Sequence, residues 1–292
     1  MGIRPTDLVD LHTHSNSSDG TSQPFELVLQ ANATGVRMIA LTDHDTLAGL
    51  DDLLAAAGRY RIHPVPGIEI SSHLGGRQLH ILGLGMRRQH WPELEKFLEQ
   101  TRSWREERNE KILARLNDLG FALTWEAVLA ECGGDIVARP HFARALITAG
   151  HVASFRQAFG ELLGDGCPAH VPKRRPLPEE VVKVLQGTGA VAIVAHPNSL
   201  VAGDGGPLTP VLELLLEAGI DGVEAFHPRM SPAQTEETLA FASKNNLLVT
   251  GGSDFHGRNK PDNPMGRGFG GRKLFARPMV EAVTRFEQIV RW

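Results

Sequence analysis

The sequence predicts an α/β fold, a distorted seven-stranded (β/α)7 barrel with an inserted small all-helical domain. Short apolar runs alternate with amphipathic stretches of helical period, which indicates parallel strands joined by helical crossovers. The runs are apolar on both faces, as is typical of barrel strands surrounded by helices. The expected strands are Leu8–His12, Arg37–Leu41, Pro64–Ile70, Gln78–Leu84, Ala190–Ala195, Gly222–Phe226 and Leu247–Thr250.

Helix starts between these strands carry recognisable signals. Ser231 precedes Pro232 and has Gln234 three residues later, a capping box with proline at the first helical position. Ser154 and Gln157 form a second capping box. This second box lies in a region where strand patterns are absent.

That region extends from about Leu94 to Val171 and contains only helical patterns. We therefore expect residues 94–171 to form a helical insertion between the fourth and fifth strands, covering the active site. Residues 1–93 and 172–292 should form the barrel.

The composition excludes several classes of protein. The net charge of −4 gives no global attraction to nucleic acid or to an anionic membrane. Cys132 and Cys167 lie far apart, which argues against a thiolate zinc site and a disulfide framework and indicates a reducing compartment. Since no apolar stretch reaches the ~18 residues of a membrane span, we expect a cytoplasmic location without a membrane partner.

Each expected strand contains a side chain that can bind a metal or is closely followed by one. In the first, His12 and His14 are two residues apart and point to the same face of an extended strand, so both imidazoles can reach one ion. The active site of a parallel barrel lies at the C-terminal ends of its strands, so the side chains there should converge. Besides these two histidines they are Asp19, His44, Glu69, His80, His196, Glu224, His227, Asp254 and His256.

Imidazole and carboxylate without thiolate favour manganese, iron(II) or zinc over magnesium and calcium. The set is too large for one ion and indicates two or three ions that share a bridging carboxylate. A single histidine at a strand end is more often a hydrogen-bonded structural group, and histidines outside the pattern, such as His63, should be surface or core residues. Asp10, Asp43 and Asp45 lie beside the expected ligands, where they could orient imidazoles or cap turns.

These motifs resemble the polymerase and histidinol phosphatase family, the PHP domain. The matching segments are DLHTHS followed by SSDG, LTDHDT, PGIEIS, LHILGLG, IVAHP, GVEAFHP and GGSDFH. The resemblance implies a distorted seven-stranded barrel with a trinuclear metal site. His12, His14, Glu69 and Asp254 would hold the first ion; Glu69 would bridge to a second with His80 and His196; and Asp19, His44 and His256 would hold the third.

The position of Asp19 differs from the pattern of several family members, which have histidine there. A carboxylate makes the third site harder, so Mn²⁺ is the expected ion, with Fe²⁺ and Zn²⁺ as alternatives. The resemblance further implies that metal-activated hydroxide attacks phosphorus. Asp254 would take part in catalysis, and His227, or otherwise His141, would act as the general acid.

The helical insertion and the segment Ala138–Phe142 resemble one branch of the family. That branch hydrolyses nucleoside 3′,5′-bisphosphates at the 3′-phosphate, and some members trim RNA from its 5′ end. Arg139 and His141 flank an expected helix N-terminus, a natural phosphate site. Arg139 could equally form a surface ion pair.

Phe226 could stack on a base, and Arg229 could face the same cleft. The low aromatic content and the lack of an extended basic stripe favour a nucleotide or a short oligonucleotide over long RNA. The oligomeric state stays open.

The sequence is also compatible with three rival functions. A histidinol-phosphate-type or other phosphomonoesterase on the same fold would not need Arg139. A metal-dependent amidohydrolase also uses a His-x-His pair, but commonly bridges its ions with a modified lysine, and no lysine ends an expected strand. A non-catalytic binding module would usually have lost ligands.

Overall fold

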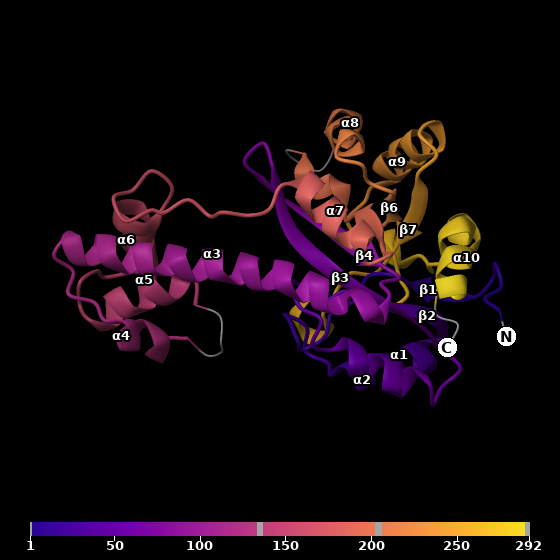
Figure 1. Cartoon of the computed structure of the whole chain (residues 1–292), viewed down its shortest axis with the longest axis horizontal. Helices are drawn as coiled ribbons and strands as arrows, with labels where there is room; N and C mark the ends of the chain where they lie inside the picture. Colours follow the sequence, from indigo (N-terminus) through magenta and orange to yellow (C-terminus); the bar gives the residue numbers. More distant parts are fainter. Residues whose placement is uncertain (1, 133–136, 202–205, 290–292) are drawn as a thin grey trace. The chain divides into compact units, whose positions relative to one another are not determined.

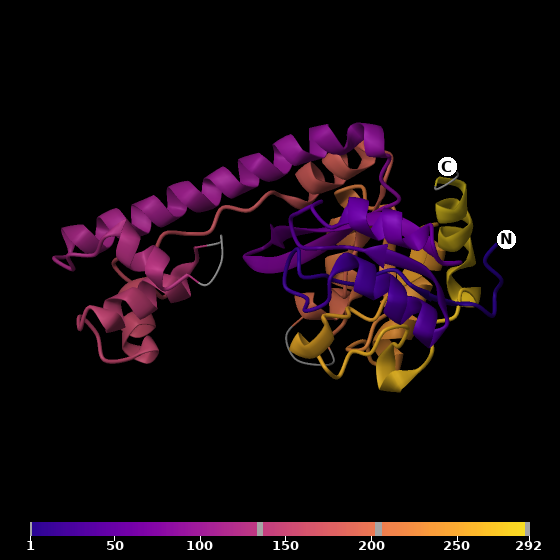
Figure 2. The ribbon, with the colours of Figure 1, turned by 90° about the horizontal axis from the view of Figure 1, so that it is seen from below.

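The computed structural model describes residues 2–132, 137–201 and 206–289 and divides into two compact units. Residues 1–98 and 176–292 form the first, here called the sheet unit. Residues 99–175 form the second, here called the helical unit. Figures 1 and 2 show the elements of each.

A seven-stranded sheet forms the centre of the sheet unit, and its strands are neighbours in sequence order. Its pairings are parallel among the first three strands and among the last three, whereas β4 is antiparallel to both of its neighbours. The strands are β1 (Leu8–Asp10), β2 (Val36–Leu41), β3 (His63–Leu74), β4 (Arg77–Leu84), β5 (Val191–Val194), β6 (Gly222–Phe226) and β7 (Leu248–Gly251).

The direction of β4 corrects the expectation of parallel strands throughout. Leu74 pairs with Arg77 across a two-residue turn. Both turn residues, Gly75 and Gly76, have positive φ, at 55° and 79°, as a tight hairpin turn with primed geometry requires. A Gly-Gly pair between two strand-like runs is a sequence signal for a β-hairpin. The alternation of strand and helix patterns does not reveal this antiparallel pairing.

The sheet is open, so the expected (β/α)7 barrel is not confirmed. β1 and β7 are the two edges of the strand order. Backbone hydrogen bonds nevertheless join the segments that follow them: Leu11 N–H donates to Gly251 O at 3.1 Å, and Asp254 N–H donates to His12 O at 2.9 Å. Because both strands are only three or four residues long, the edges meet through these loops rather than as a continuous ladder.

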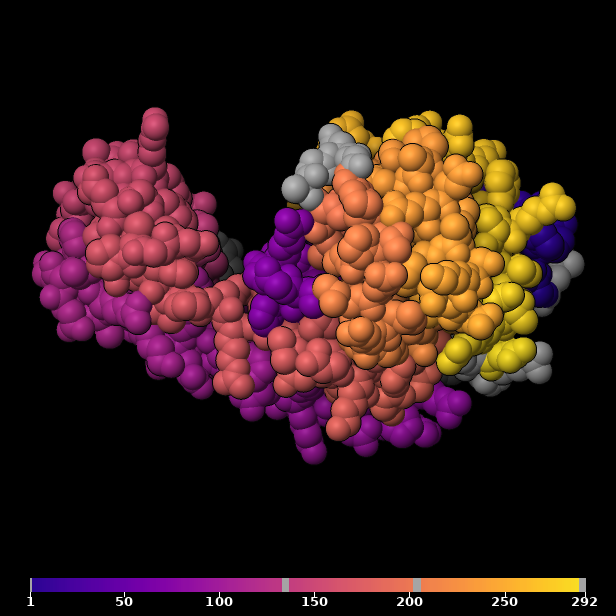
Figure 3. Space-filling model, turned by 90° about the horizontal axis from the view of Figure 1, so that it is seen from above, coloured from indigo at the N-terminus to yellow at the C-terminus, as the bar shows by residue number. Residues whose placement is uncertain are grey.

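Two apolar clusters cover the faces of the sheet. In β2 the side chains alternate, so that Ile39 and Leu41 pack in one cluster while Met38 and Ala40 pack in the other. The first cluster includes residues of α1 (Pro24–Thr34), α2 (Leu50–Ala57), α7 (Pro178–Gly187), α8 (Thr209–Glu217) and α9 (Pro232–Lys244). The second includes residues of α10 (Val280–Ile289). One surface of the sheet unit is formed mainly by the chain from α7 onward (Figure 3).

Short 3₁₀ turns connect several of these elements, namely η1 (Arg88–His90), η3 (Pro197–Leu200), η4 (Gly257–Asn259), η5 (Phe269–Gly271) and η6 (Arg277–Met279). The capping box expected at Ser231 is present: its hydroxyl accepts from Gln234 N–H at 3.3 Å, and Gln234 Oε1 accepts from Ser231 N–H at 3.1 Å.

The described part of the helical unit contains helices and no strand. α3 (Trp91–Asp118) leads into it and is followed by α4 (Trp125–Ala130), α5 (Arg139–Thr148), α6 (Phe155–Ala158) and the π-helical turn η2 (Phe159–Leu163). Its own apolar core includes Ile112, Phe142 and Leu146, all fully buried. Although α3 is long, it is rich in charge, and no described helix meets the length and apolarity needed to cross a membrane.

Candidate metal centre

The expected metal ligands of the sheet unit converge at one end of the sheet. His12 and His14 follow β1, His44 follows β2, and His196 follows β5. Glu69 and His80 lie within β3 and β4, not at the ends of these strands. Because β4 runs antiparallel, its N-terminal half lies at the same edge as the C-terminal ends of the parallel strands, and His80 pairs with Ser71 of β3 there.

Glu69 lies at the centre of the group and is 1% exposed. Its Oε1 is 2.8 Å from His80 Nδ1 and 3.0 Å from His196 Nε2. Its Oε2 is 3.3 Å from His12 Nε2, 3.1 Å from His14 Nε2 and 3.3 Å from His44 Nδ1. One carboxylate therefore faces five imidazoles, the geometry of a bridging group.

A first subset surrounds the Nε2 atoms of His12 and His14, which are 3.1 Å apart. Asp254 Oδ1 lies 3.7 Å from His12 Nε2 and 3.5 Å from His14 Nε2. Together with Glu69 Oε2, these four atoms can surround a single ion.

A second subset lies nearer the surface, around Asp19. Its Oδ1 is 3.1 Å from His256 Nε2 and 3.7 Å from His14 Nδ1, and its Oδ2 is 3.7 Å from His44 Nε2. Asp19 is half-exposed, whereas His256 is buried. The separations allow the carboxylate and the imidazoles to bind a common ion.

The positions of the donor atoms suit binding to divalent ions better than hydrogen bonding between the side chains. Buried nitrogens of His14 (Nδ1), His80 (Nδ1) and His256 (Nε2) lack a hydrogen bond of acceptable geometry, although carboxylate oxygens lie 2.8 to 3.7 Å away. Two ligands of one ion at ~2.1 Å are about 3.0 to 3.4 Å apart, and their lone pairs point at the ion. Four groups of three or more such residues have mutually close ligand atoms, which supports a site for divalent metal ions.

Further side chains orient the imidazoles. His12 Nδ1 donates to Glu224 Oε1 at 3.0 Å, and Glu224 Oε2 accepts from His196 N–H at 2.8 Å. His256 Nδ1 donates to the carbonyl oxygen of Asp254 at 2.9 Å. Such bonds fix the tautomer and aim the other ring nitrogen at the ion. The sequence placed Glu224 among the metal-capable side chains at the strand ends; in the structure it instead acts as the hydrogen-bond partner of the expected ligand His12.

Asp10, Asp43 and Asp45 hold loops rather than imidazoles. Asp10 accepts from Ser253 N–H and Oγ–H, at 2.8 and 2.6 Å, and from Gly266 N–H at 2.7 Å. Asp43 accepts from both N–H and Oγ–H of Ser15. Asp45 accepts from the N–H of the β3 residue Ser71. Burial raises the pKa of Asp10 to about 6, against the lowering effect of the bonds from Ser253 and Gly266.

Unusual backbone conformations occur at the same loops. His196 and Asp254 have φ of 29° and 52°, and Asp45 has 51°, values that side chains other than glycine rarely adopt. Gly252 is needed for space, because a Cβ there would lie 2.2 Å from the Cβ of His12. Local strain of this kind is concentrated at functional sites in proteins.

Burial and mutual charge set the protonation of the group. Burial lowers the pKa of His14 to about 3 and also lowers that of His196, so both rings are neutral, as metal binding requires. Burial by itself would raise the pKa of the Glu69 carboxyl, but the histidines around it hold that pKa well below its ordinary value. The central carboxylate is therefore ionised.

A cavity of about 410 Å³ opens over the group. Besides expected ligands, its lining includes three cationic side chains, Arg77, Arg229 and Lys260. Lys260 Nζ lies 2.7 Å from Asp254 Oδ2. Arg229 was expected at this cleft, whereas Arg77 and Lys260 were not, because they lie in β4 and in the loop after β7, outside the strand-end motifs.

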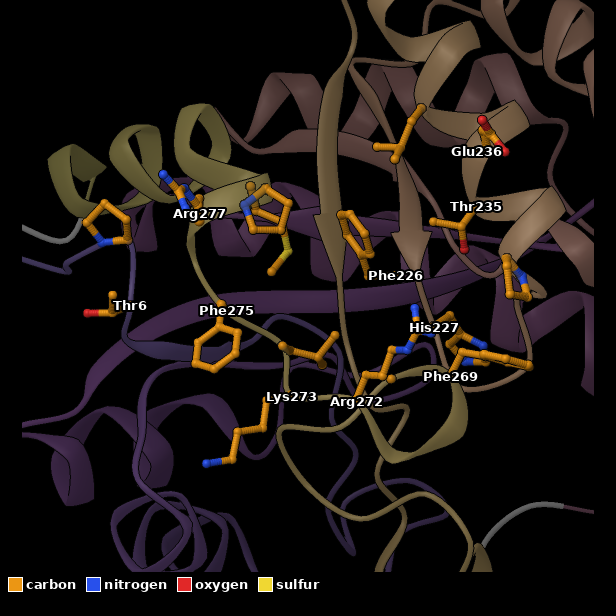
Figure 4. A pocket seen from close by; sticks show the side chains of 17 residues that line it. Thr6, Phe226, His227, Thr235, Glu236, Phe269, Arg272, Lys273, Phe275 and Arg277 are labelled. Atoms are coloured by element: carbon orange, nitrogen blue, oxygen red, sulfur yellow. The ribbon is translucent and has the colours of Figure 1, made fainter.

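His227 and Phe226 are not among the residues that line that cavity. His227 is fully buried; its Nε2 is 3.5 Å from Asp254 Oδ2, and its Nδ1 accepts from Arg229 N–H at 3.2 Å. Both residues line a different cavity, of about 530 Å³ (Figure 4).

Arg139 and His141 begin α5 in the helical unit. Arg139 donates to Asp165 Oδ1 at 3.0 Å and to Leu163 O at 3.2 Å, and it lies over the ring of Phe159. The ion pair that was the alternative reading of Arg139 is therefore present. His141 Nδ1 accepts from Ala138 N–H at 3.0 Å, closing the first turn.

Known proteins are similar to this chain in sequence and in architecture. The PHP domain family matches residues 10–161. A 5′-3′ exoribonuclease of Haemophilus influenzae is 35% identical over 85% of this chain and 89% of its own length. A 3′,5′-nucleoside bisphosphate phosphatase of Chromobacterium violaceum is 33% identical over 85% of this chain and 87% of its own length.

A phosphoribosyl 1,2-cyclic phosphate 1,2-diphosphodiesterase of Eggerthella lenta is 34% identical over 85% of this chain and 94% of its own length. A crystal structure from Bifidobacterium adolescentis, provisionally described as a metal-dependent phosphoesterase, superposes with a TM-score of 0.68 at 30% identity. That alignment covers 95% of both chains. With the family match and relatives of this similarity, the chain belongs to the PHP domain family.

Proposed function

We propose that this chain removes the 3′-phosphate from nucleoside 3′,5′-bisphosphates, using two or three Mn²⁺ ions. At the coarser level it is a hydrolase of phosphoester bonds. The observation that carries the proposal is the group around Glu69, which opens into a cavity whose wall includes Arg77, Arg229 and Lys260. A carboxylate and imidazoles that fit ions, beside three cations, suit a phosphate group.

Divalent ions bound by this group would activate water and offset charge on the phosphate oxygens. The chain's own residues prepare the site for this. Glu69 is ionised and central, and Glu224 holds the proton of His12 on Nδ1, which leaves Nε2 free to bind an ion. Arg229 and Arg77 would bind the non-bridging oxygens of the reacting phosphate.

His227 remains the first candidate for the general acid. Its Nδ1 accepts a bond from the Arg229 backbone, so the proton of the neutral ring lies on Nε2, facing Asp254. Proton delivery to the leaving oxygen would require Asp254 Oδ2 or a water between them. His141 is the second candidate.

The helical unit would recognise the second phosphate and cover the active site. α5 begins at Arg139, so the positive end of the helix dipole lies near this residue. Its partner Asp165 is 84% exposed, and an ion pair with so exposed a carboxylate contributes little to stability. A phosphate could therefore replace Asp165 at low cost.

The relatives support nucleotide substrates, and one of them also supports a second candidate function. Because a 5′-3′ exoribonuclease is 35% identical to this chain, the second candidate function is the trimming of short 5′-phosphorylated RNA. Both reactions place a phosphoester at the ions and a second phosphate nearby.

The test is phosphate release by Mn²⁺-loaded protein from adenosine 3′,5′-bisphosphate, 5′-AMP, histidinol phosphate and a 5′-phosphorylated RNA oligomer. We expect fast loss of only the 3′-phosphate from the bisphosphate. Equal turnover of simple monoesters would overturn the proposal.

The role of the helical unit is tested with Arg139→Ala. Loss of a charge-assisted phosphate contact worth ~1.5–3 kcal/mol should raise KM for the bisphosphate roughly ten- to hundredfold, with little effect on p-nitrophenyl phosphate. Arg144→Ala is the matched control, since Arg144 lies in the same helix and donates to the backbone of Glu131.

A further inference from the structure

A second cavity of the sheet unit, of about 530 Å³, has none of the expected metal ligands in its lining. It lies between α9, the end of β6 and the chain from Gly268 to Met279, with Pro5 and Thr6 at its edge. Figure 4 shows the side chains that line it. Cavities that hold small ligands measure about 300–1,000 Å³, so this one has room for a single small molecule.

Three phenylalanine rings contribute to the lining of the cavity. Phe226 is half-buried, while Phe269 and Phe275 are 40% and 42% exposed at the cavity. Figure 4 shows Phe269 and Phe275 on either side of Phe226 in that view. Leu239 and Met279 complete an apolar surface. Exposed phenylalanines around a hollow favour a flat apolar group that can stack on them.

Cationic side chains alternate with these rings. Arg272, Lys273 and Arg277 line the cavity and are exposed. Within the described ranges of the chain, none of the three has a side-chain hydrogen bond or ion pair, even though Glu236 lines the same cavity. Three cations and one carboxylate leave a positive excess, so the complementary ligand is an anion that also carries a flat ring.

The cavity adjoins the metal centre but shares no lining residue with the cavity over the expected ligands. His227 makes the connection to the metal centre: it lines the second cavity, and its Nε2 lies 3.5 Å from Asp254 Oδ2. Because His227 is fully buried, it forms a wall and not a passage. The separate linings of the two cavities favour a separate free ligand over the continuation of an RNA substrate.

We propose that this cavity is a binding site for a nucleoside monophosphate. The base would stack on Phe269 and Phe226, and the phosphate would bind Arg272, Lys273 or Arg277. A nucleoside monophosphate is also the product of the proposed reaction, but binding at this site does not depend on that reaction. Through His227, an occupant would lie one side chain away from the Asp254 carboxylate.

Photocrosslinking of the full, Mn²⁺-loaded chain with 8-azido-AMP locates the site directly. We expect labelled peptides from residues 268–279, with labelling suppressed by excess AMP but not by the same concentration of inorganic phosphate. Label confined to residues around Glu69 and His196, or no label that AMP suppresses, overturns the proposal. Because this readout involves no turnover, it is distinct from the phosphate-release test of the proposed function.

Calorimetric titration with AMP tests the side chains. The combined substitution Arg272→Ala, Lys273→Ala and Arg277→Ala should weaken the cavity's binding event at least tenfold, and Phe269→Ala should weaken it severalfold. The matched controls are Arg59→Ala with Arg61→Ala, and Phe25→Ala, which alter exposed residues of the same unit away from both cavities. Unchanged AMP binding in the triple variant, with its Tm retained, contradicts the assignment.

Discussion

The ion-binding end of the sheet unit and the core of the helical unit are built in opposite ways. The first buries ionisable groups: His12, His14 and Glu69 are at most 1% exposed, and they come from the segment after β1 and from β3. The second buries apolar side chains such as Ile112, Phe142 and Leu146. Several of its arginines donate to carbonyl groups, as Arg108 does to Val171 O at 2.9 Å.

The two units are therefore stabilised by different interactions. Burying an ionisable group is unfavourable unless a partner compensates it, so the histidines and carboxylates of the sheet unit need ions as well as each other. The helical core needs only close packing of apolar groups. Metal binding should therefore matter to one unit and not to the other.

The largest effect is expected for Glu69→Gln. Losing the carboxylate that faces five imidazoles should remove ions whose contribution is several kcal/mol, which corresponds to a loss of activity of roughly a thousandfold or more. Activity and metal content by mass spectrometry measure it. Glu179→Gln, an exposed residue of α7, is the control. Retention of metal and rate by the Glu69 variant would remove the basis of the comparison.

Leu146→Ala should affect only the helical unit. Leu146 is fully buried, and such truncations cost about 2–5 kcal/mol. Denaturant unfolding followed by tryptophan fluorescence gives the free energy, with the 44%-exposed Leu129 changed to Ala as a mild control. Metal content should stay unchanged. If Leu146→Ala releases the ions, the two units are coupled and the contrast between them is wrong.

Glu224→Gln should weaken metal binding roughly ten- to hundredfold, because it disturbs the carboxylate that orients His12. Competition with a chelator measures the affinity. Asp10→Asn is the informative companion: its partners are Ser253 and Gly266, so it should lower Tm more than it lowers metal affinity. The reverse ranking would show that loop anchoring, not imidazole orientation, controls the ions.

The smallest effect concerns His63, a histidine outside the metal centre. Burial lowers its pKa, against the raising effect of its bond to the carbonyl of Phe286. The fold therefore favours the neutral ring, and its contribution to stability is present above pH ~6.5 and lost as the pH falls through the folded pKa. In Mn²⁺-loaded protein, Tm should fall less for His63→Gln than for the wild type between pH 7.5 and 5.5. Equal falls would contradict this account.

Much of the candidate site could be inferred from the sequence because strand geometry is local. His12 and His14 face the same side by the two-residue period of a strand, and the motifs around Glu69 and Asp254 mark positions that the fold brings within a few ångströms of each other. The positions of the strands likewise follow from runs of apolar residues, but their ends do not: β1 ends at Asp10, before the expected His12, and β3 continues to Leu74, beyond the expected Ile70.

Other features depended on partners far away in sequence. The sequence alone determined which segments form strands and helices and which side chains gather at their ends, since periodicity and capping act over a few residues. The open sheet, the orientation of His12 by Glu224 and the places of Arg77 and Lys260 at the cavity over the expected ligands emerge only from the three-dimensional fold. Each of these features depends on how residues tens to hundreds of positions apart pack together. No local sequence pattern encodes which distant residue a side chain will contact.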